Sequence, residues 1–293
     1  MTLAQALVYG VVQGFTEYLP ISSTAHLRIV PALLGWRDPG AAFTAIIQLG
    51  TLGAVLLYFC NDIISISRAT CVGFAHGKPF ETFEAKLGWM ILAGTIPVVA
   101  VGAWFKENIE NNLRSLYVVS GAMIGLAILL MAAEWVTRER VARGQKFKEM
   151  GDLGWVDAIV VGLAQAVALV PGSSRSGVTI TGGLFLGMTR DTAARFSFLL
   201  SLPSVFAAGA YELFKHRHEF LGTQDGIIDL LAASITAGAV GYASIAFLLR
   251  YLKTHTTYPF IIYRLALGGL ILVLLSTGKI QPAQPPAPVP ISS

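Results

Sequence analysis

Charged side chains are scarce in this chain of 293 residues: they make up 13% of it, against 54% hydrophobic residues. Ordinary globular domains carry about 25% charged residues, so the composition excludes a soluble enzyme with a fully hydrated surface. The mean hydropathy of +0.65 excludes a disordered chain as well. The net charge is +4, but the basic residues form no stripe beside a nucleic-acid-binding motif, so we expect no nucleic-acid partner.

Cysteine is almost absent too. Cys60 and Cys71 are isolated, and no CxxC pair occurs. This excludes a disulfide framework and a cysteine-rich metal site. The first 16 residues lack both a basic start and a small-residue cleavage site, so we do not interpret them as a signal peptide.

Long apolar stretches dominate what is present. A helix needs about 20 mostly apolar residues to cross a bilayer. The sequence predicts six such spans, whose charge-free cores are 41–61, 87–105, 116–133, 196–211, 230–249 and 265–278. The predicted fold class is therefore an all-α polytopic membrane protein.

Two further apolar regions, 1–36 and 156–187, are each interrupted by a cluster of proline, serine and glycine. The interruptions read PISST at 20–24 and PGSSRSG at 171–177. Each flanking half is too short to cross alone, and non-helical backbone at membrane depth requires protein or a water-filled cavity around it. We therefore predict two re-entrant helix–loop–helix hairpins.

The two halves of the chain resemble each other. At an offset of about 152 residues the matches include Gly10 with Gly162, Gln13 with Gln165, and Ser22-Ser23 with Ser173-Ser174. Each half would contain one hairpin and three spans, an odd number of crossings, so the second half would be inverted relative to the first. The predicted divisions are a single membrane domain 1–280, made of repeat one 1–136, a basic cytoplasmic loop 137–155 and repeat two 156–280, and a proline-rich tail 281–293 without fixed structure.

Basic residues predict the orientation, because cytoplasmic loops are enriched in lysine and arginine. If loop 61–86 is cytoplasmic, that side collects the larger set: Arg68, Lys78, Lys86, Arg138, Arg140, Arg143, Lys146, Lys148, Arg190, Arg195, Arg250 and Lys253. The other side has only Lys106, Arg114, Lys215, Arg217 and Lys279. Both termini would then lie outside the cytoplasm.

Ionisable residues within membrane segments cost about 2.5–3.5 kcal/mol on insertion scales and usually serve a function. Glu17 lies one helical turn after Gln13, and His26 follows the first interruption. Arg175 lies inside the second interruption among serines. An inverted repeat would bring these two polar clusters face to face.

Such a pair of clusters suits phosphate chemistry. The second cluster offers a helix start and a guanidinium for an anion, and the first offers groups for proton transfer, nucleophilic attack or cation binding. This pattern indicates hydrolysis of a phosphorylated lipid. Each residue also has a simpler interpretation: Arg175 forms a structural ion pair with Glu17, and His26 only packs.

Other polar residues have structural interpretations first. Ser22 and Ser173 are expected to be helix caps or turn residues, and Gln165 is expected to tie helices together. Glu134, Asp152 and Asp157 flank the basic loop and are expected to be solvated.

The motifs together resemble a known family. Residues 13–17 fit [E/Q]xxxE, residues 20–26 fit PxSSTxH, and residues 171–179 fit PGxSRSxxT. These three motifs, in this order, resemble the bacterial undecaprenyl-diphosphatases, also known as bacitracin-resistance membrane phosphatases. The resemblance runs from about residue 3 to residue 278.

The resemblance implies hydrolysis of undecaprenyl diphosphate to undecaprenyl phosphate and phosphate, dependent on Mg²⁺ or Ca²⁺, in the bacterial inner membrane with the site facing outward. It implies that Glu17 is a metal ligand or acid–base group, that His26 is the acid–base group or a phosphate acceptor, and that Ser23 is a nucleophile or donor. The implied diphosphate-binding residues are Gln13, Ser22, Ser173, Ser174, Arg175, Ser176 and Thr179. Gln13 stands where many members have a carboxylate, and a neutral amide binds a cation more weakly.

Alternatives remain from the residues themselves. Inverted repeats with broken helices are also typical of secondary transporters, so a transporter or lipid flippase is the main rival, and a scaffold without chemistry is a third interpretation. The lipid phosphatases with a Kx6RP–PSGH–SRx5Hx3D motif set are excluded, since PSGH is absent. The expected partners are a polyprenyl diphosphate, membrane lipid and, compatible with the sequence, a second copy of the chain.

Overall fold

A computed structural model describes residues 1–105 and 113–282, and within these ranges the chain is helical, with no strand. The helices are α1 Leu3–Tyr18, α2 Ser23–Leu34, α3 Gly40–Tyr58, α4 Cys60–Ala75, α5 Phe83–Trp104, α7 Leu116–Ala142, α8 Trp155–Val167, α9 Arg175–Phe185, α10 Arg190–Lys215, α11 Arg217–Leu221, α12 Gln224–Leu252 and α13 Tyr258–Ser276, with a short 3-10 turn at Met150–Asp152.

Six of the helices in the described ranges are long and apolar enough to span a membrane: α3, α5, α7, α10, α12 and α13. Each coincides with one of the six predicted charge-free cores, although cores 41–61, 87–105 and 265–278 run past the ends of α3, α5 and α13. The protein is a multi-pass membrane protein. One prediction was incomplete. Residues 61–86, interpreted as a loop, contain most of α4, which continues from α3 after a break at Phe59. The hydropathy pattern did not predict this helix, because it begins with the acidic residue Asp62 in its first turn and mixes polar with apolar residues along its length.

Both predicted interruptions separate two short helices. Ser22 is the N-cap of α2 and accepts a hydrogen bond from the Ala25 amide, as expected. In the second interruption the cap is Ser174, which accepts from the Gly177 amide. Ser173 lies in the turn just before it and donates its amide to the Val170 carbonyl, so its expected role as a cap or turn residue is confirmed as a turn residue. Both caps have positive φ, 75° and 68°, a conformation that is uncommon outside glycine.

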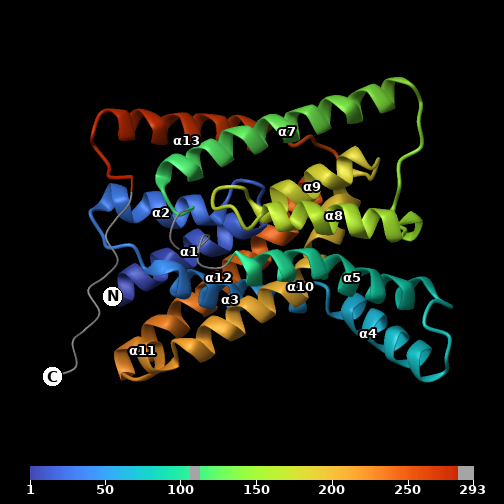
Figure 1. Cartoon of the computed structure of the whole chain (residues 1–293), viewed down its shortest axis with the longest axis horizontal. Coiled ribbons are helices and arrows are strands. Elements are labelled where there is room, and N and C mark those ends of the chain that lie inside the picture. Colours follow the sequence, from blue (N-terminus) through green and yellow to red (C-terminus); the bar gives the residue numbers. More distant parts are fainter. Residues whose placement is uncertain (106–112, 283–293) are drawn as a thin grey trace.

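The two short pairs lie towards opposite ends of the molecule (Figure 1): α1 and α2 on one side, α8 and α9 on the other. Each first helix packs on a span from the other half, α1 on α12 and α8 on α5. Glycines allow this close approach: a Cβ at Gly10 would meet the backbone of Ala233, and a Cβ at Gly162 would meet the backbone of Gly94.

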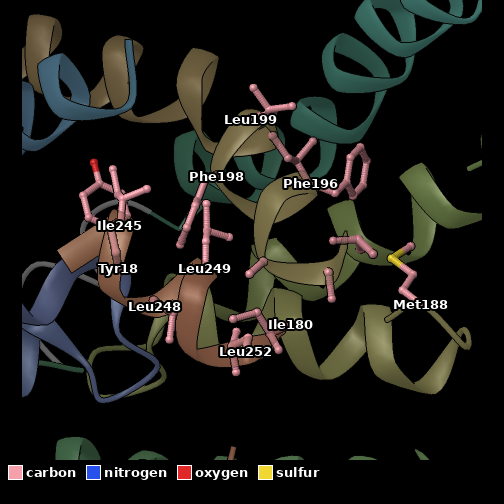
Figure 2. Packing of buried hydrophobic residues seen from close by; sticks show 14 of the residues in the cluster. Tyr18, Ile180, Met188, Phe196, Phe198, Leu199, Ile245, Leu248, Leu249 and Leu252 are labelled. Carbon is pink, nitrogen blue, oxygen red and sulfur yellow. The ribbon is translucent and has the colours of Figure 1, made fainter. Parts of the chain in front are cut away.

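The main core lies where α10 and α12 meet the broken helices. Figure 2 shows Tyr18, Phe198, Ile245 and Leu249 close together within this cluster. The rings of Tyr18 and Phe198 meet edge to face with centroids 5.1 Å apart, a favoured geometry for aromatic pairs. The core thus joins the end of α1 to the middle of α10.

Two of the three carboxylates expected to be solvated are buried. Glu134 of α7 accepts hydrogen bonds from Arg190 at 2.6 and 2.9 Å and from the amide and hydroxyl of Thr257. Asp157 accepts from Lys148 at 2.6 Å and from the Gly154 amide. Both expectations were wrong: Glu134 is paired with residues of α10 and at the start of α13, and Asp157 with Lys148 and with the N-cap of its own helix. Asp152 is exposed, as predicted.

The segments that connect the helices lie at the two ends of the molecule. The turn between α4 and α5 and the loop between α7 and α8 lie at one end, whereas α11 and the N-terminus lie at the other (Figure 1). Lys106 and the proline-rich tail from residue 283 onward lie outside the described residues, so the expectation for the tail stays a prediction.

Candidate functional site

The two interrupted segments contact each other through an ion pair. Nη2 of Arg175, the first residue of α9, donates to Glu17 Oε1 at 3.0 Å. Beside it, Ser176 Oγ donates to the carbonyl oxygen of Leu19 at 3.1 Å. The end of α1 is therefore joined to the start of α9, and the predicted approach of Glu17 and Arg175 is observed.

Glu17 is surrounded by donors. Its Oε2 accepts from Gln13 Nε2 and from Ser23 Oγ, each at 2.8 Å. The one-turn spacing of Gln13 and Glu17 on α1 produces the first contact, and the reversal of the chain at Ser22 produces the second. The carboxylate thus holds an amide, a hydroxyl and a guanidinium in one cluster.

This cluster forms part of the wall of a cavity of about 290 Å³. The polar residues of the wall include Glu17, Ser22, Ser23, Thr24, Thr44, Gln48, Arg114, Gln165, Ser174, Arg175 and Ser204. Alanine and valine side chains of α3, α5 and α10 complete it, together with Ala168, Leu169 and Pro171 of the segment after α8. A polar pocket with an apolar side matches an amphiphile that has a charged head and a hydrocarbon tail.

Arg175 keeps hydrogen-bonding capacity beyond the ion pair. Its Nε and Nη1 are buried and have no partner among the described residues. A second guanidinium, that of Arg114, lines the same cavity and donates to Asp38 Oδ2 at 3.1 Å. Since guanidinium groups bind phosphate oxygens in a bidentate manner, the cavity is suited to an anion.

His26 lies on α2 and is buried, but it does not belong to the cavity wall. Its Nδ1 lies 2.7 Å from the carbonyl oxygen of Ser22, so this nitrogen donates. Its Nε2 lies 2.6 Å from the hydroxyl of Tyr263 in α13, and the two rings stack. Tyr263 was missed by the sequence reasoning, because a tyrosine inside an apolar span carries no distinctive signal.

Three of the predicted phosphate-binding residues face the protein interior. Ser176 bonds Leu19, and Thr179 Oγ1 bonds the Arg175 carbonyl and Ser197 Oγ, the latter at 2.6 Å. Ser173 is fully buried. Its Oγ has no partner among the described residues. Ser176 and Thr179 therefore hold the start of α9 in place, and the contact of all three residues with phosphate stays a prediction.

Arg264 supports the second interruption from behind. This fully buried side chain of α13 donates to the carbonyl oxygens of Gly172 and Ser173 at 3.3 and 2.9 Å, and to Met123 at 3.2 Å. The sequence reasoning missed it, although a lone arginine beside the apolar core 265–278 is itself a signal. Arg264 thereby fixes the loop that presents Ser174 and Arg175.

The oxygen atoms near Glu17 fit a divalent cation held jointly with a ligand. Gln13 Oε1 is buried next to the Glu17 carboxylate and has no hydrogen-bond partner in the part of the chain that the structure describes. Within residues 1–105 and 113–282, no three His, Cys, Asp or Glu side chains are placed so that they could hold a metal ion by themselves. Mg²⁺ commonly takes one or two carboxylates and completes its shell with phosphate oxygens and water, which agrees with this donor set.

Comparison with known proteins agrees with the motifs. The family model described as bacitracin resistance protein BacA matches residues 6–270. A protein named undecaprenyl-diphosphatase from Chlorobium phaeovibrioides is 61% identical over 282 residues, covering 96% of this chain and all of the relative. Proteins of the same name from Chloroherpeton thalassium and Chlorobaculum tepidum are 59% and 60% identical, over 96% of this chain and 99% and 100% of their own lengths.

Proposed function

Because the chain belongs to the bacitracin resistance protein BacA family, we propose that it hydrolyses undecaprenyl diphosphate to undecaprenyl phosphate and inorganic phosphate. This reaction would recycle the carrier lipid for peptidoglycan and other envelope polymers and confer bacitracin resistance. The observation that carries the proposal is Arg175, which lines the cavity with two unpartnered nitrogens beside the Glu17–Ser23 pair.

Substrate binding would begin with an exchange of partners. In the structure Arg175 is paired with Glu17. A diphosphate carries more negative charge than one carboxylate and accepts a bidentate guanidinium contact, so it competes for Arg175. Ser22, Ser174 and Arg114 stand in the same wall as further donors. Glu17 would then be freed from its guanidinium partner.

The freed carboxylate would act as the base. Ser23 Oγ already donates to Glu17, the arrangement of an activated hydroxyl nucleophile. In the proposed step this oxygen bonds the terminal phosphorus, its proton passes to Glu17, and the bond to the bridging oxygen breaks, releasing undecaprenyl phosphate. Water then hydrolyses the phosphoserine and releases phosphate.

The Ser23→Ala variant tests which oxygen attacks. Loss of turnover, together with a phosphoserine trapped by rapid acid quenching of the unmodified protein, supports Ser23. Retained turnover assigns the attack to a water held by Glu17.

His26 would transfer protons from behind the cavity wall, relayed through Ser22 or through solvent entering on binding. A divalent cation, Mg²⁺ or Ca²⁺, would be held by Glu17 and Gln13 and would neutralise charge on the diphosphate. Ser173, Ser176 and Thr179 would support the same anion loop. The homodimer compatible with the sequence stays a prediction.

We also propose the finer architecture: two re-entrant hairpins, α1–α2 and α8–α9, in halves of opposite topology. Three observations support it. The helix starts Ser23 and Arg175 lie 152 residues apart, both caps have positive φ, and the packing of α1 on α12 mirrors that of α8 on α5. The cavity between the interruptions is where such repeats place a binding site.

The proposed location is the bacterial inner membrane, with the cavity open to the extracytoplasmic side. The predicted basic loop 137–155 is shorter in the structure, because α7 continues to Ala142 and leaves 143–154 as the loop. This loop and the α4–α5 turn lie at one end of the molecule, which the positive-inside rule assigns to the cytoplasm. Single cysteines at Lys146 and Arg217, in a variant lacking Cys60 and Cys71, test this. Only the Arg217→Cys variant should react with an impermeant thiol reagent added outside intact cells. Reaction of the Lys146→Cys variant instead would show that the orientation is the opposite of the one proposed.

Phosphate release by the purified full-length protein in detergent tests the activity itself. With undecaprenyl diphosphate and Mg²⁺ or Ca²⁺ present, we expect turnover that chelation reduces. A secondary transporter or flippase would release no phosphate there, because transport does not break the phosphoanhydride bond. Loss of the guanidinium in the Arg175→Ala variant should lower turnover by at least ~10²-fold. Phosphate release at an unchanged rate in this variant would contradict the role given to Arg175.

A further inference from the structure

Gln165 of α8 is buried with its amide unpaired. The residue has no exposed surface, and neither Nε2 nor Oε1 has a partner among the described residues. A carboxamide can donate two hydrogen bonds and accept others. Burial without these bonds destabilises a protein, so such a group calls for an explanation, often a ligand.

The expected structural role is not observed. Gln13, at the matching position of α1, is held by Glu17 one turn later. One turn after Gln165 the chain has Leu169, which offers no side-chain acceptor. The sequence interpretation of Gln165 as a tie between helices therefore fails within the described residues. The close contact of α8 with α5 depends on Gly162 and Gly94 instead.

Gln165 stands in the wall of the cavity that also contains Glu17 and Arg175. Of the wall residues, all within the described ranges, Gln165 and Arg175 are the two with buried polar side-chain atoms that lack partners. The unpaired atoms of Arg175 are donors, and those of Gln165 are a donor and an acceptor. Unsatisfied donors from two different helices thus surround one space.

We propose that Gln165 is a substrate-binding residue whose Nε2 donates to a non-bridging oxygen of the bound diphosphate, in the same cavity as Arg175. The inference rests on the proposed function, whose substrate it shares. The amide is unsatisfied in the free protein because its partner arrives with the substrate. This explains why an apolar residue, which would fill the same space without an orphaned amide, does not occupy the position.

The test compares Gln165→Met and Gln13→Met with the unmodified full-length protein in detergent. Methionine keeps the length of the side chain and removes the amide. We measure the Tm, the KM for undecaprenyl diphosphate and the inhibition constant of inorganic pyrophosphate. For Gln165→Met we expect an unchanged or higher Tm, with both constants raised about 10- to 100-fold, the range for a hydrogen bond to a charged group. For Gln13→Met we expect a lower Tm, since the buried contact with Glu17 is lost.

A lower Tm with unchanged KM and inhibition constant for Gln165→Met would overturn the inference and restore a structural role. Should that variant fold poorly, Gln165→Glu is the second test: it is isosteric, and its charge opposes the phosphate, so the inhibition constant of pyrophosphate should rise further. If the unmodified protein releases no phosphate, the proposed function fails. The stabilisation of the protein by pyrophosphate, compared between the unmodified protein and Gln165→Met, then still decides whether Gln165 binds the anion.

Discussion

Glu17 has two relationships to Arg175: it holds the guanidinium in the free protein and competes with any anion for it. Replacing Glu17 with glutamine removes the competing charge but keeps the shape. We expect Glu17→Gln to bind inorganic pyrophosphate more tightly than the unmodified protein. Its turnover should fall by about 10²-fold or more, since the base is lost. Titration of thermal stabilisation and phosphate release measure the two effects.

Glu139→Gln is the matched control, because Glu139 forms an exposed pair with Arg143. That variant should behave like the unmodified protein. Weaker pyrophosphate binding by Glu17→Gln would show that the carboxylate supports the anion, through a cation or a proton, more than it competes with it.

At this scale the sequence was informative where residues stand in motifs. Glu17, Ser23 and Arg175 were recognised because polar groups interrupt apolar stretches, and they lie together. Arg264 and Tyr263 stand alone on α13, and only tertiary contacts reveal what they hold. Whether an amide such as Gln165 is paired likewise depends on three-dimensional neighbours.

Among the elements, the two helix starts at the interruptions combine a cap with strained backbone. Alanine at Ser22 or Ser174 loses the cap and keeps the positive φ, whereas glycine loses the hydroxyl but relieves the strain. We expect each glycine variant to be more stable than the matching alanine variant by about 1 kcal/mol. Chemical denaturation in mixed micelles measures the difference; equal stabilities would indicate that the caps are unstrained.

The loop before α9 depends on α13. Arg264→Met would leave the carbonyl oxygens of Gly172 and Ser173 without their donor in a dry environment. The free energy of unfolding should fall by about 2 kcal/mol or more, and turnover should fall as the loop loosens. Arg217→Met, which removes an exposed arginine of α11, is the control. A stable, fully active Arg264→Met variant would rule out this support.

The elements were largely predictable, and the exceptions have physical reasons. Charge-free stretches identify spans because lipid excludes charges, so all six were found. Which of Ser173 and Ser174 caps α9 could not be predicted, because adjacent serines are equivalent in sequence and only the backbone reversal distinguishes them. The helix α4 was missed because it carries no continuous apolar stretch.

For the molecule as a whole, the ion pair between Glu134 and Arg190 joins α7 to α10. Glu134 also accepts a hydrogen bond from the hydroxyl of Thr257 at the start of α13. Removing one partner leaves a buried charge, so Glu134→Leu should destabilise the protein by about 3 kcal/mol. The double variant Glu134→Leu/Arg190→Leu should regain most of that loss. Thermal unfolding of the purified variants measures both.

The exposed pair Lys78–Glu81 provides the contrast: Glu81→Ala should change stability by less than about 1 kcal/mol. If the double variant is no more stable than Glu134→Leu, the hydrogen bonds to Thr257 matter more than the charge pair. Sequence alone could not assign this role, since proximity to a basic loop suggested solvation and the partners lie far along the chain.

The packing of α1 on α12 and of α8 on α5 determines the order in which these helices can pack during synthesis. When α8 leaves the ribosome, its partner α5 is already inserted, so the second pair can dock as it is made. α1 is translated first, yet α12 begins only at Gln224, so the N-terminal pair waits in the bilayer with its glycine face uncovered until most of the polypeptide has been inserted. A chain at this stage would contain the whole first half of the sequence but lack the surface of α12 on which α1 packs.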